Sequence, residues 1–593
     1  MNRCFLYIAV VAGILTAACS KESPKEESPK EEEKGIPVTG VTLNRAAILI
    51  VGRTQTFEAT VEPNDADNKN VTWSTNDEQV VTVNTAGEVV AVTPGTATIT
   101  ATTDDGRYTA TCTVTVTTSG ITMTTANSYA YISISIPLGT DNVLINWGDG
   151  EESNMNDASS KEEFPNDDYL SLSFYQSYSS SSVHNITITG DILSLDCSTN
   201  LLTTLDVSYY PALTILNCTG NLLTTLDISR NTALRELTCN ANQLTALDVS
   251  LNNELTVLSF GGNELTTLDV SHNTALTVLG CHVNQLTALD VSHNTALKTL
   301  YCNDNQLTSL DVSRNTALTT LHCHRTQLTT LDVSNNTELI ELYCHDNQLT
   351  TLDVSGATAL ITLGCSNNQL TTLDVSGAIA LTTLGCVSNR LTALDVSNNT
   401  MLEIIYCTSN MLTTLDASGA AALTMLWCDY NNLTTLDVSG ASALRDLSCT
   451  ENQLTTLDVS HNTALVGLSC SSNQLTTLDV SGATALRDLT CYNNQLSTLD
   501  VSGATALRDL SCESNQLTEL DLSKNIDLIR LRCGSNQLTA SALNDLFKSL
   551  RISVPHTPGP HEIGWFLIDI SDNIGERDCD VSIAEEKGWK VYR

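Results

Sequence analysis

Residues 297–317 read LKTLYCNDNQLTSLDVSRNTA, and this 21-residue pattern recurs from about residue 192 to residue 537. Its cysteine position occurs 17 times between residues 197 and 533, and only Phe260 replaces the cysteine. The asparagine three residues later is replaced only at Thr326, and the aspartate of the LDVS element occupies all 16 of its positions from 206 to 521. A fixed period of this length is the signature of a solenoid built from stacked coils.

The repeat predicts a strand rather than a helix, because Leu297, Leu300, Leu307 and Leu310 lack the spacing of a long amphipathic helix. In a short strand, Leu300 and Cys302 point inward on alternate residues. Strands of neighbouring coils are expected to stack into a parallel sheet, with the LDVS element forming the opposite wall. At ~4.8 Å per coil, the repeats predict a rod on the order of 80 Å long.

The two nested patterns, LxxLxCxxNxL and LxxLDVSxN, resemble the bacterial leucine-rich repeats of 21 residues. The resemblance implies a leucine-rich-repeat solenoid, in which a single coil cannot bury its own leucines and coil stacking supplies the stability. Leucine-rich repeats serve many partners, so the resemblance predicts binding without naming a ligand.

Three columns of identical side chains follow from the period. The cysteines stand where the general pattern takes leucine, so we predict core packing rather than disulfides or metal ligands. The asparagines, Asn305 and its equivalents, are expected to satisfy backbone groups at the bend after each strand. The aspartates are expected either to be exposed or to accept hydrogen bonds from N–H groups and hydroxyls such as that of Ser313, with calcium bridging as the alternative.

A binding site is expected where outward positions of the sheet break the uniformity of the repeat. Large aromatic side chains with polar neighbours favour recognition of proteins or sugar rings. A histidine cluster could instead hold a metal ion, although coil spacing is not adjusted to tetrahedral ligands, and unselected surface variation is the remaining reading. The candidate binding residues form two groups: Tyr301, His322, His324, Tyr343 and His345, and then Tyr406, Trp427, Asp429 and Tyr430.

The first residues predict export. Arg3 precedes the apolar run from Phe5 to Leu15, which is too short for a membrane anchor. Residues 15–19, LTAAC, resemble the lipobox of bacterial lipoproteins, which implies cleavage before Cys19 and lipidation of that residue. An ordinary signal peptide is the alternative. We therefore predict a lipoprotein signal peptide at 1–18, followed at 19–36 by a disordered acidic stalk that also resembles surface-export tethers of the Bacteroidetes.

Residues 37–117 predict an all-β domain of about seven short strands. One strand is expected at Thr56–Val61, and Trp73 is expected on a central strand. The VTWS element and the later run GTATITA resemble the bacterial Ig-like group 2 domain. That resemblance implies a sandwich that serves as a spacer or, less often, as an adhesin tip.

Residues 118–190 predict a second β-rich unit, either a PKD-like domain suggested by the WGDG turn at 147–150 or a cap over the first coil. Asp149 in that turn is ordinary turn chemistry or a calcium ligand. The solenoid, about 17 repeats, is placed at 191–537, and an α/β cap at 538–593 contains a helix at Ser541–Leu550 and a strand at Trp565–Ile570.

The whole chain is thus expected to be mostly β. Its formal net charge of −39 disfavours nucleic acid as a partner. No nucleophile elbow, HExxH or P-loop motif occurs, so no enzyme and no cofactor are predicted. The predicted function is a lipid-anchored outer-membrane protein that binds an extracellular protein in the manner of an adhesin. A glycan-binding accessory lipoprotein for nutrient capture and a structural surface spacer are the alternatives.

Overall fold

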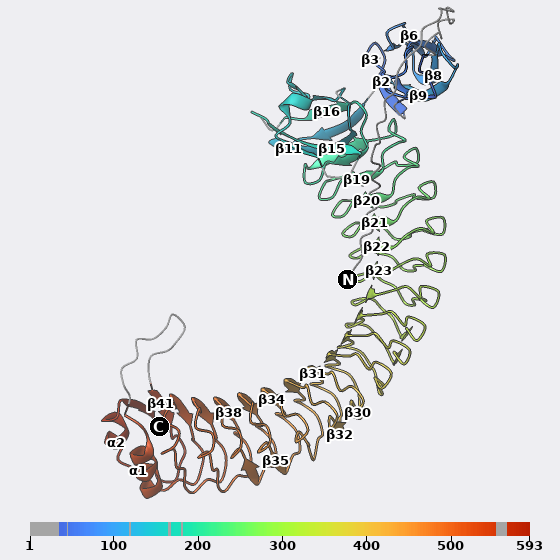
Figure 1. Cartoon of the computed structure of the whole chain (residues 1–593). Helices are drawn as coiled ribbons and strands as arrows, with labels where there is room; N and C mark the ends of the chain where they lie inside the picture. The colour runs from blue at the N-terminus through green and yellow to red at the C-terminus, as the bar shows by residue number, and fades with distance from the viewer. Residues whose placement is uncertain are drawn as a thin grey trace, which may run out of the picture.

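The structure, a computed structural model, describes residues 35–43, 46–117, 120–140, 142–163, 168–179, 182–552 and 566–593 (Figure 1). The predicted signal peptide, Cys19 and the stalk up to residue 34 lie outside the described residues. The described chain is mostly β, with a long curved solenoid between a pair of small β domains and a C-terminal cap. None of its helices is long and apolar enough to cross a membrane.

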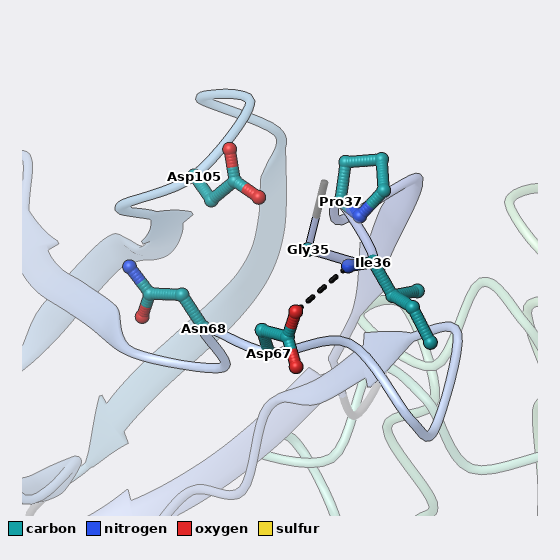
Figure 2. Close-up of a pocket in the computed structure, with 6 residues that line it drawn as sticks. All are labelled: Gly35, Ile36, Pro37, Asp67, Asn68 and Asp105. Carbon is teal, nitrogen blue, oxygen red and sulfur yellow. Dashed lines mark hydrogen bonds between the residues drawn. The ribbon is translucent and has the colours of Figure 1, made fainter. Parts of the chain in front are cut away.

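The end of the predicted stalk is held against the first domain (Figure 2). The N–H of Ile36 donates to Oδ2 of Asp67 at 2.8 Å, and the carbonyl of Ile36 accepts from the N–H of Asp67 at 3.1 Å. The N–H of Val38 donates to Asp105 Oδ2 at 3.1 Å. Ile36, at the end of the predicted stalk, is therefore bonded to the first domain through Asp67, and the rest of the stalk up to residue 34 lies outside the described residues.

The first domain is a β-sandwich. A pair of strands, β1 (Gly40–Thr42) and β4 (Thr60–Glu62), lies beside two larger sheets. The four-stranded sheet has the order β2 (Ala46–Ile50), β9 (Thr109–Thr117), β8 (Gly95–Thr103), β5 (Val71–Thr75), and the three-stranded sheet has the order β3 (Thr54–Thr56), β7 (Glu88–Ala91), β6 (Val81–Val83). A separate core of apolar residues fills the space between the sheets.

Two details of this domain differ from the sequence prediction. The single strand expected at Thr56–Val61 is divided between β3 and β4, which belong to different sheets. Trp73 lies on β5, an edge strand, and is only half-buried. Its indole packs over Gly87, where an added Cβ would come within 2.9 Å of the ring. The tryptophan therefore covers a turn at the sheet edge instead of filling the centre.

The second domain is built from two sheets that share one core with the solenoid. One sheet has the order β13 (Glu152–Asn154), β12 (Leu144–Asn146), β16 (His184–Thr189), β10 (Ile121–Thr125), β18 (Leu202–Asp206), and a 3-10 turn (Met155–Asp157) follows β13. The other contains β14 (Ser160–Glu163), β15 (Tyr169–Ser177) and β11 (Tyr129–Pro137).

This second domain covers the N-terminal end of the solenoid. Strand β11 pairs antiparallel with β17 (Ser194–Asp196), the first strand of the solenoid sheet. Asn200 fixes the junction, because its side chain donates to the carbonyl of Tyr131 at 2.6 Å and accepts from the N–H of Tyr131 at 2.7 Å. In the WGDG turn, Trp147 is fully buried, and Asp149 accepts from the N–H of Glu151 and from Gln176.

The solenoid sheet continues from β17 as a series of parallel, in-register strands of three residues. Their bounds repeat with the period of the sequence. They are β19 (Ile215–Asn217), β20 (Glu236–Thr238), β21 (Val257–Ser259), β22 (Val278–Gly280), β23 (Thr299–Tyr301), β24 (Thr320–His322), β26 (Glu341–Tyr343), β28 (Thr362–Gly364), β29 (Thr383–Gly385), β31 (Ile404–Tyr406), β33 (Met425–Trp427), β34 (Asp446–Ser448), β36 (Gly467–Ser469), β38 (Asp488–Thr490), β39 (Asp509–Ser511) and β40 (Arg530–Arg532).

The interior of each coil agrees with the predicted alternation. Leu300 and Cys302 are fully buried, and the ladder cysteines are all free. Burial raises the pKa of the Cys302 thiol to about 12, so it stays protonated. Asn305 donates to the carbonyls of Cys281 (2.9 Å) and Cys302 (3.1 Å) and accepts from the N–H of Leu286 (2.9 Å). Core packing of the cysteines and backbone satisfaction by the asparagines are therefore confirmed.

The solenoid is an arc, a curvature that the predicted stack of coils did not specify (Figure 1). The continuous sheet follows the concave side, whereas the LDVS wall on the convex side forms only three strand pairs between coils among the described residues. These pairs are β25 (Thr330–Asp332) with β27 (Thr351–Asp353), β30 (Ala393–Asp395) with β32 (Thr414–Asp416), and β35 (Thr456–Asp458) with β37 (Thr477–Asp479). Hydrogen bonds hold the concave side at strand spacing in every coil, but they hold the convex side at that spacing only at three junctions. The coils therefore lie closer together on the concave side, and the stack curves with the continuous sheet on its inner side.

The C-terminal cap closes the other end. Helix α1 (Ala540–Ser549) begins after the N-cap Thr539, whose side chain accepts from the N–H of Ala542, and buries Leu543, Leu546 and Phe547. Strand β41 (Phe566–Asp569) extends the solenoid sheet, β42 (Trp589–Tyr592) ends it, and α2 (Ser582–Glu585) precedes β42. The predicted helix and strand agree with α1 and β41 within one residue.

Candidate functional site

The candidate residues lie on the concave sheet, in columns that run from coil to coil. In each strand the middle leucine and the following cysteine point inward, so the residues on either side of each face outward. Tyr301, His322 and Tyr343 are register partners on adjacent strands and form one column. His324 and His345 follow the cysteines of their coils and belong to the next column.

The first group forms one continuous cluster of rings, which we call the His–Tyr patch (Tyr301, His322, His324, Tyr343 and His345). The ring of His322 makes edge contacts with Tyr301 at 4.8 Å and with Tyr343 at 4.9 Å between centroids. His324 and His345 stack almost parallel, at 4.2 Å and 11°. The structure therefore brings together all five residues of this predicted group.

Charged groups surround the histidines of this patch. Nε2 of His322 lies 3.6 Å from Oε2 of Glu341, and Nδ1 of His345 lies 2.8 Å from Oδ2 of Asp346. Burial lowers the pKa of His322, although Glu341 opposes the shift. For His324, burial and the neighbouring His345 lower the pKa to about 4. His324 is therefore neutral at pH 7, and its stacked ring presents an uncharged surface.

The second group is brought together only in part. Tyr406 and Trp427 are register partners whose rings meet edge to face at 5.1 Å, and we call them the Tyr–Trp patch. The hydroxyl of Tyr406 points to Sδ of Met425 at 3.3 Å. Trp427 remains 41% exposed, which is unusual for a tryptophan inside a regular sheet. This pair offers an apolar surface beside a polar tip.

Asp429 and Tyr430 do not extend that surface. Asp429 accepts a hydrogen bond from the hydroxyl of Ser448 and one from the N–H of Thr450 at 2.8 Å, so it serves the next coil. Tyr430 sits in the turn after the sheet with φ of +53° and is 59% exposed. Asp429 occupies the neighbouring column, the position that His324 and His345 hold in their coils, whereas Tyr430 lies in the turn that follows.

The aspartate column lies on the convex face and is explained by local hydrogen bonding. Each aspartate accepts, through Oδ1, the N–H of the serine two residues later, as in the bond of 2.9 Å from Ser313 to Asp311. The hydroxyl and the N–H of Ser313 lower the pKa of Asp311. The side chains are exposed, so water and these donors stabilise the charges. The hydrogen-bonded reading of this column is confirmed.

The cysteine column and the aspartate column were both considered as possible metal sites. Within the described ranges, no group of three or more His, Cys, Asp or Glu side chains has a geometry that could hold a metal ion. The shallow depressions of the convex face, such as one of about 470 Å³ between Asp374 and Asp395, contain the hydrogen-bonded aspartates.

One feature between the two patches was missed by sequence reasoning. The column that carries Tyr343 and Tyr406 holds glycine on the two strands between them, Gly364 and Gly385. The ring of Tyr343 leans over Gly364, where an added Cβ would lie 2.6 Å from Cδ1. At Gly385 an added Cβ would meet nothing closer than 3.7 Å. Only large side chains were considered in the sequence, and this feature, which consists of two outward positions without a side chain, was therefore not found.

Comparison with known proteins identifies the first domain. Residues 37–114 match the family model of the bacterial Ig-like domain (group 2). Among curated proteins, the α-L-arabinofuranosidase of Bifidobacterium longum subsp. longum is 50% identical over 68 residues, which are 12% of this chain and 6% of that protein. The Ig-like virion protein of Serratia phage KSP90 is 45% identical over 112 residues, 18% of this chain and 43% of that protein. The chain thus spans less than half the length of either.

The solenoid is similar to solved leucine-rich-repeat structures. The functional domain of InlJ from Listeria monocytogenes, which includes a cysteine ladder, is 36% identical; the match covers 59% of this chain and 77% of that one, with a TM-score of 0.48.

Proposed function

We propose that this chain is a cell-surface lipoprotein whose solenoid binds an extracellular protein, from a host or from another bacterium, in the manner of an adhesin. The observation that carries the proposal is the gathering of the His–Tyr and Tyr–Trp patches on the concave sheet. Exposed aromatic side chains with polar neighbours dominate the energetics of protein interfaces. A concave sheet presents both patches toward the same bound partner.

Each part of the molecule has a role in this proposal. The Ig-like sandwich and the second domain hold the solenoid away from the membrane. The acidic segment before Gly35 links the sandwich to Cys19, where acyl chains would anchor the protein in the outer membrane. The net charge of −39 disfavours close approach to anionic lipid, so the solenoid would project outward.

The binding experiment uses the full-length chain in detergent against arrays of extracellular proteins and of glycans. Tyr343→Ala and Trp427→Ala are the test variants, and Tyr492→Ala, at a similarly exposed tyrosine in another coil, is the matched control. We expect protein binding that each test variant weakens about tenfold or more and that the control leaves unchanged. Protein binding that survives both test variants would place the site elsewhere, and no binding at all would favour a structural spacer.

A glycan ligand is the second candidate. The exposed Tyr–Trp patch could stack on a sugar ring, and a Bifidobacterium glycosidase shares the Ig-like segment. A glycan hit lost in Trp427→Ala would establish nutrient capture instead of adhesion. Anchoring is tested separately, because labelled palmitate should enter the wild-type chain and be absent from Cys19→Ala.

A further inference from the structure

The strands between the two patches carry no side chain in the central outward column. Tyr343, Gly364, Gly385 and Tyr406 are consecutive register partners on β26, β28, β29 and β31. At about 4.8 Å per strand, the outer two are roughly 14 Å apart. Because the ring of Tyr343 covers Gly364, the open part lies over Gly385. We call this opening the glycine gap.

The walls of the gap are aromatic and firmly placed. The ring of Tyr343 is held by the edge contact with His322, and Tyr406 is held by Trp427 and by its bond to Met425. Tyr406 leans toward Met425, away from Gly385, which leaves the floor of the gap uncovered. A group over Gly385 would lie one strand from Gly364, which the ring of Tyr343 covers, so that ring is within reach of a cation–π contact of about 6 Å.

The charges around the gap are acidic. Glu341 stands on the strand of Tyr343, and Glu403 is exposed immediately before the strand of Tyr406. No lysine or arginine occupies an outward position of the four strands, since the remaining positions hold Thr, Ser, Val, Ile and His. The coils on either side of the gap therefore carry negative charge that favours a positive ligand, and the carboxylate of Glu341 also faces Nε2 of His322 at 3.6 Å.

The polar groups fit a sugar less well. The hydroxyl of Ser366, which borders the floor, already accepts the N–H of Val387 at 3.1 Å. The outward positions of β28 and β29 hold no amide or carboxylate side chain, which are the groups that would pair with several sugar hydroxyls over the floor. A single cationic side chain needs only the ring of Tyr343 and the acidic groups of the flanking coils.

We propose that the glycine gap between Tyr343 and Tyr406 receives an arginine or lysine side chain of the bound protein. The guanidinium or ammonium group lies over Gly385 beside the ring of Tyr343, with Glu341 and Glu403 on the flanking coils. The inference rests on the proposed protein-binding function and specifies the residue that the concave face selects. It also accounts for the paired glycines, because any larger residue at Gly385 would occupy the same space.

The test uses a library of synthetic dodecapeptides on the full-length chain. We expect the retained peptides to contain arginine or lysine, and replacement of that arginine by neutral, isosteric citrulline, or of that lysine by norleucine, to weaken binding about tenfold. Gly385→Leu should weaken binding to a similar extent by filling the gap. Gly467→Leu is the matched control, because that glycine faces outward on the same sheet with its nearest neighbour at 3.6 Å.

The outcomes separate the two proposals. Peptides that keep their affinity with the neutral side chain, or that bind Gly385→Leu as well as wild type, would overturn the cation site while protein binding stands. Binding of glycans alone, or of nothing, would overturn both. If Gly385→Leu folds poorly, two other measurements keep the test valid. Gly385→Ala adds only a methyl group, and the neutral peptides are tested on the unchanged protein.

Discussion

The coils before Gly356 and those after it share one concave sheet but differ on the convex side. In the earlier coils a buried asparagine follows the LDVS element, as at Asn294, whose side chain donates to the carbonyls of Val270 (3.0 Å) and Asn273 (2.9 Å) of the preceding coil. In the later coils most of these asparagines are replaced by a Gly-Ala pair, such as Gly356-Ala357.

The replacement changes how closely neighbouring coils approach. The approach of two coils is given by the distance from a Cβ added at the glycine to the serine carbonyl oxygen of the preceding coil. This distance is 1.7–1.9 Å where the preceding coil carries asparagine, at Gly356, Gly419 and Gly482. It is 2.1–2.6 Å where the preceding coil carries the Gly-Ala pair, at Gly377, Gly440 and Gly503. The three convex strand pairs form across the first set of junctions.

The position after the LDVS element therefore distinguishes the convex junctions, whereas the coils share one leucine framework. A buried amide ties neighbouring coils together on the convex side. Glycine lets them approach until backbone hydrogen bonds form, such as the N–H of Val459 to the carbonyl of Asp479. Such convex pairs between coils occur at three junctions of the arc in the described residues (Figure 1).

The largest effect is expected when a side chain is forced into a close junction. Gly482→His places a Cβ where Ser460 O lies 1.7 Å away, so we expect a loss of about 3 kcal/mol in unfolding free energy. The double change Gly482→His and Ala483→Asn converts the junction to the other type, and it should recover at least half of that loss. Urea unfolding of both variants measures the difference. A double variant no more stable than the single one would contradict the role of the asparagine.

A smaller loss is expected from removal of the asparagine itself. Asn399→Ala deletes donors to the carbonyls of Val375 and Ala378, each at 2.9 Å, and leaves both carbonyls buried. The expected cost is about 2 kcal/mol. The neighbouring Asn398 is exposed, so Asn398→Ala should change stability by less than about 0.5 kcal/mol. Equal losses at the two positions would show that the amide does not join the coils.

The cysteine ladder tests whether the difference is confined to the convex side. Cys302 and Cys491 lie in the two regions and are equally buried. Changing either to serine places a hydroxyl in the core at a cost of about 1–3 kcal/mol, and the two costs should agree within about 0.5 kcal/mol. Thermal midpoints of the two variants provide the comparison. A clear disparity would mean that the concave halves also differ.

The sequence predicted what depends on the period of the repeat. Alternation around Leu300 and Cys302 predicted the strand, and the substitution by Phe260 indicated a packing position. Curvature was not predictable in the same way, because it depends on distances between coils that no single repeat contains. The patches followed from outward positions, whereas the glycine gap required knowing which way the rings of Tyr343 and Tyr406 lean.

The smallest expected effect concerns pH, because the histidines of the concave face among the described residues all precede Gly356. The pKa of His324, lowered to about 4, lies below its ordinary value of 6.5, so the folded state binds fewer protons than the unfolded state. Stability should therefore be complete above about pH 6.5 and fall as the pH decreases toward 4.

This contribution can be isolated by substitution, because carboxylates also titrate in that range. His345, His322, Asp304 and Arg325 all act on His324, so the net shift is measured rather than that of one pair. The thermal midpoint of His324→Asn should fall by about 1–2 °C less than that of wild type between pH 7.5 and pH 4.5. The exposed convex His293, changed to asparagine, should leave the wild-type difference unaltered. If the thermal midpoints of wild type and His324→Asn depend on pH in the same way, protonation of His324 does not destabilise the folded protein, and the lowered pKa is contradicted.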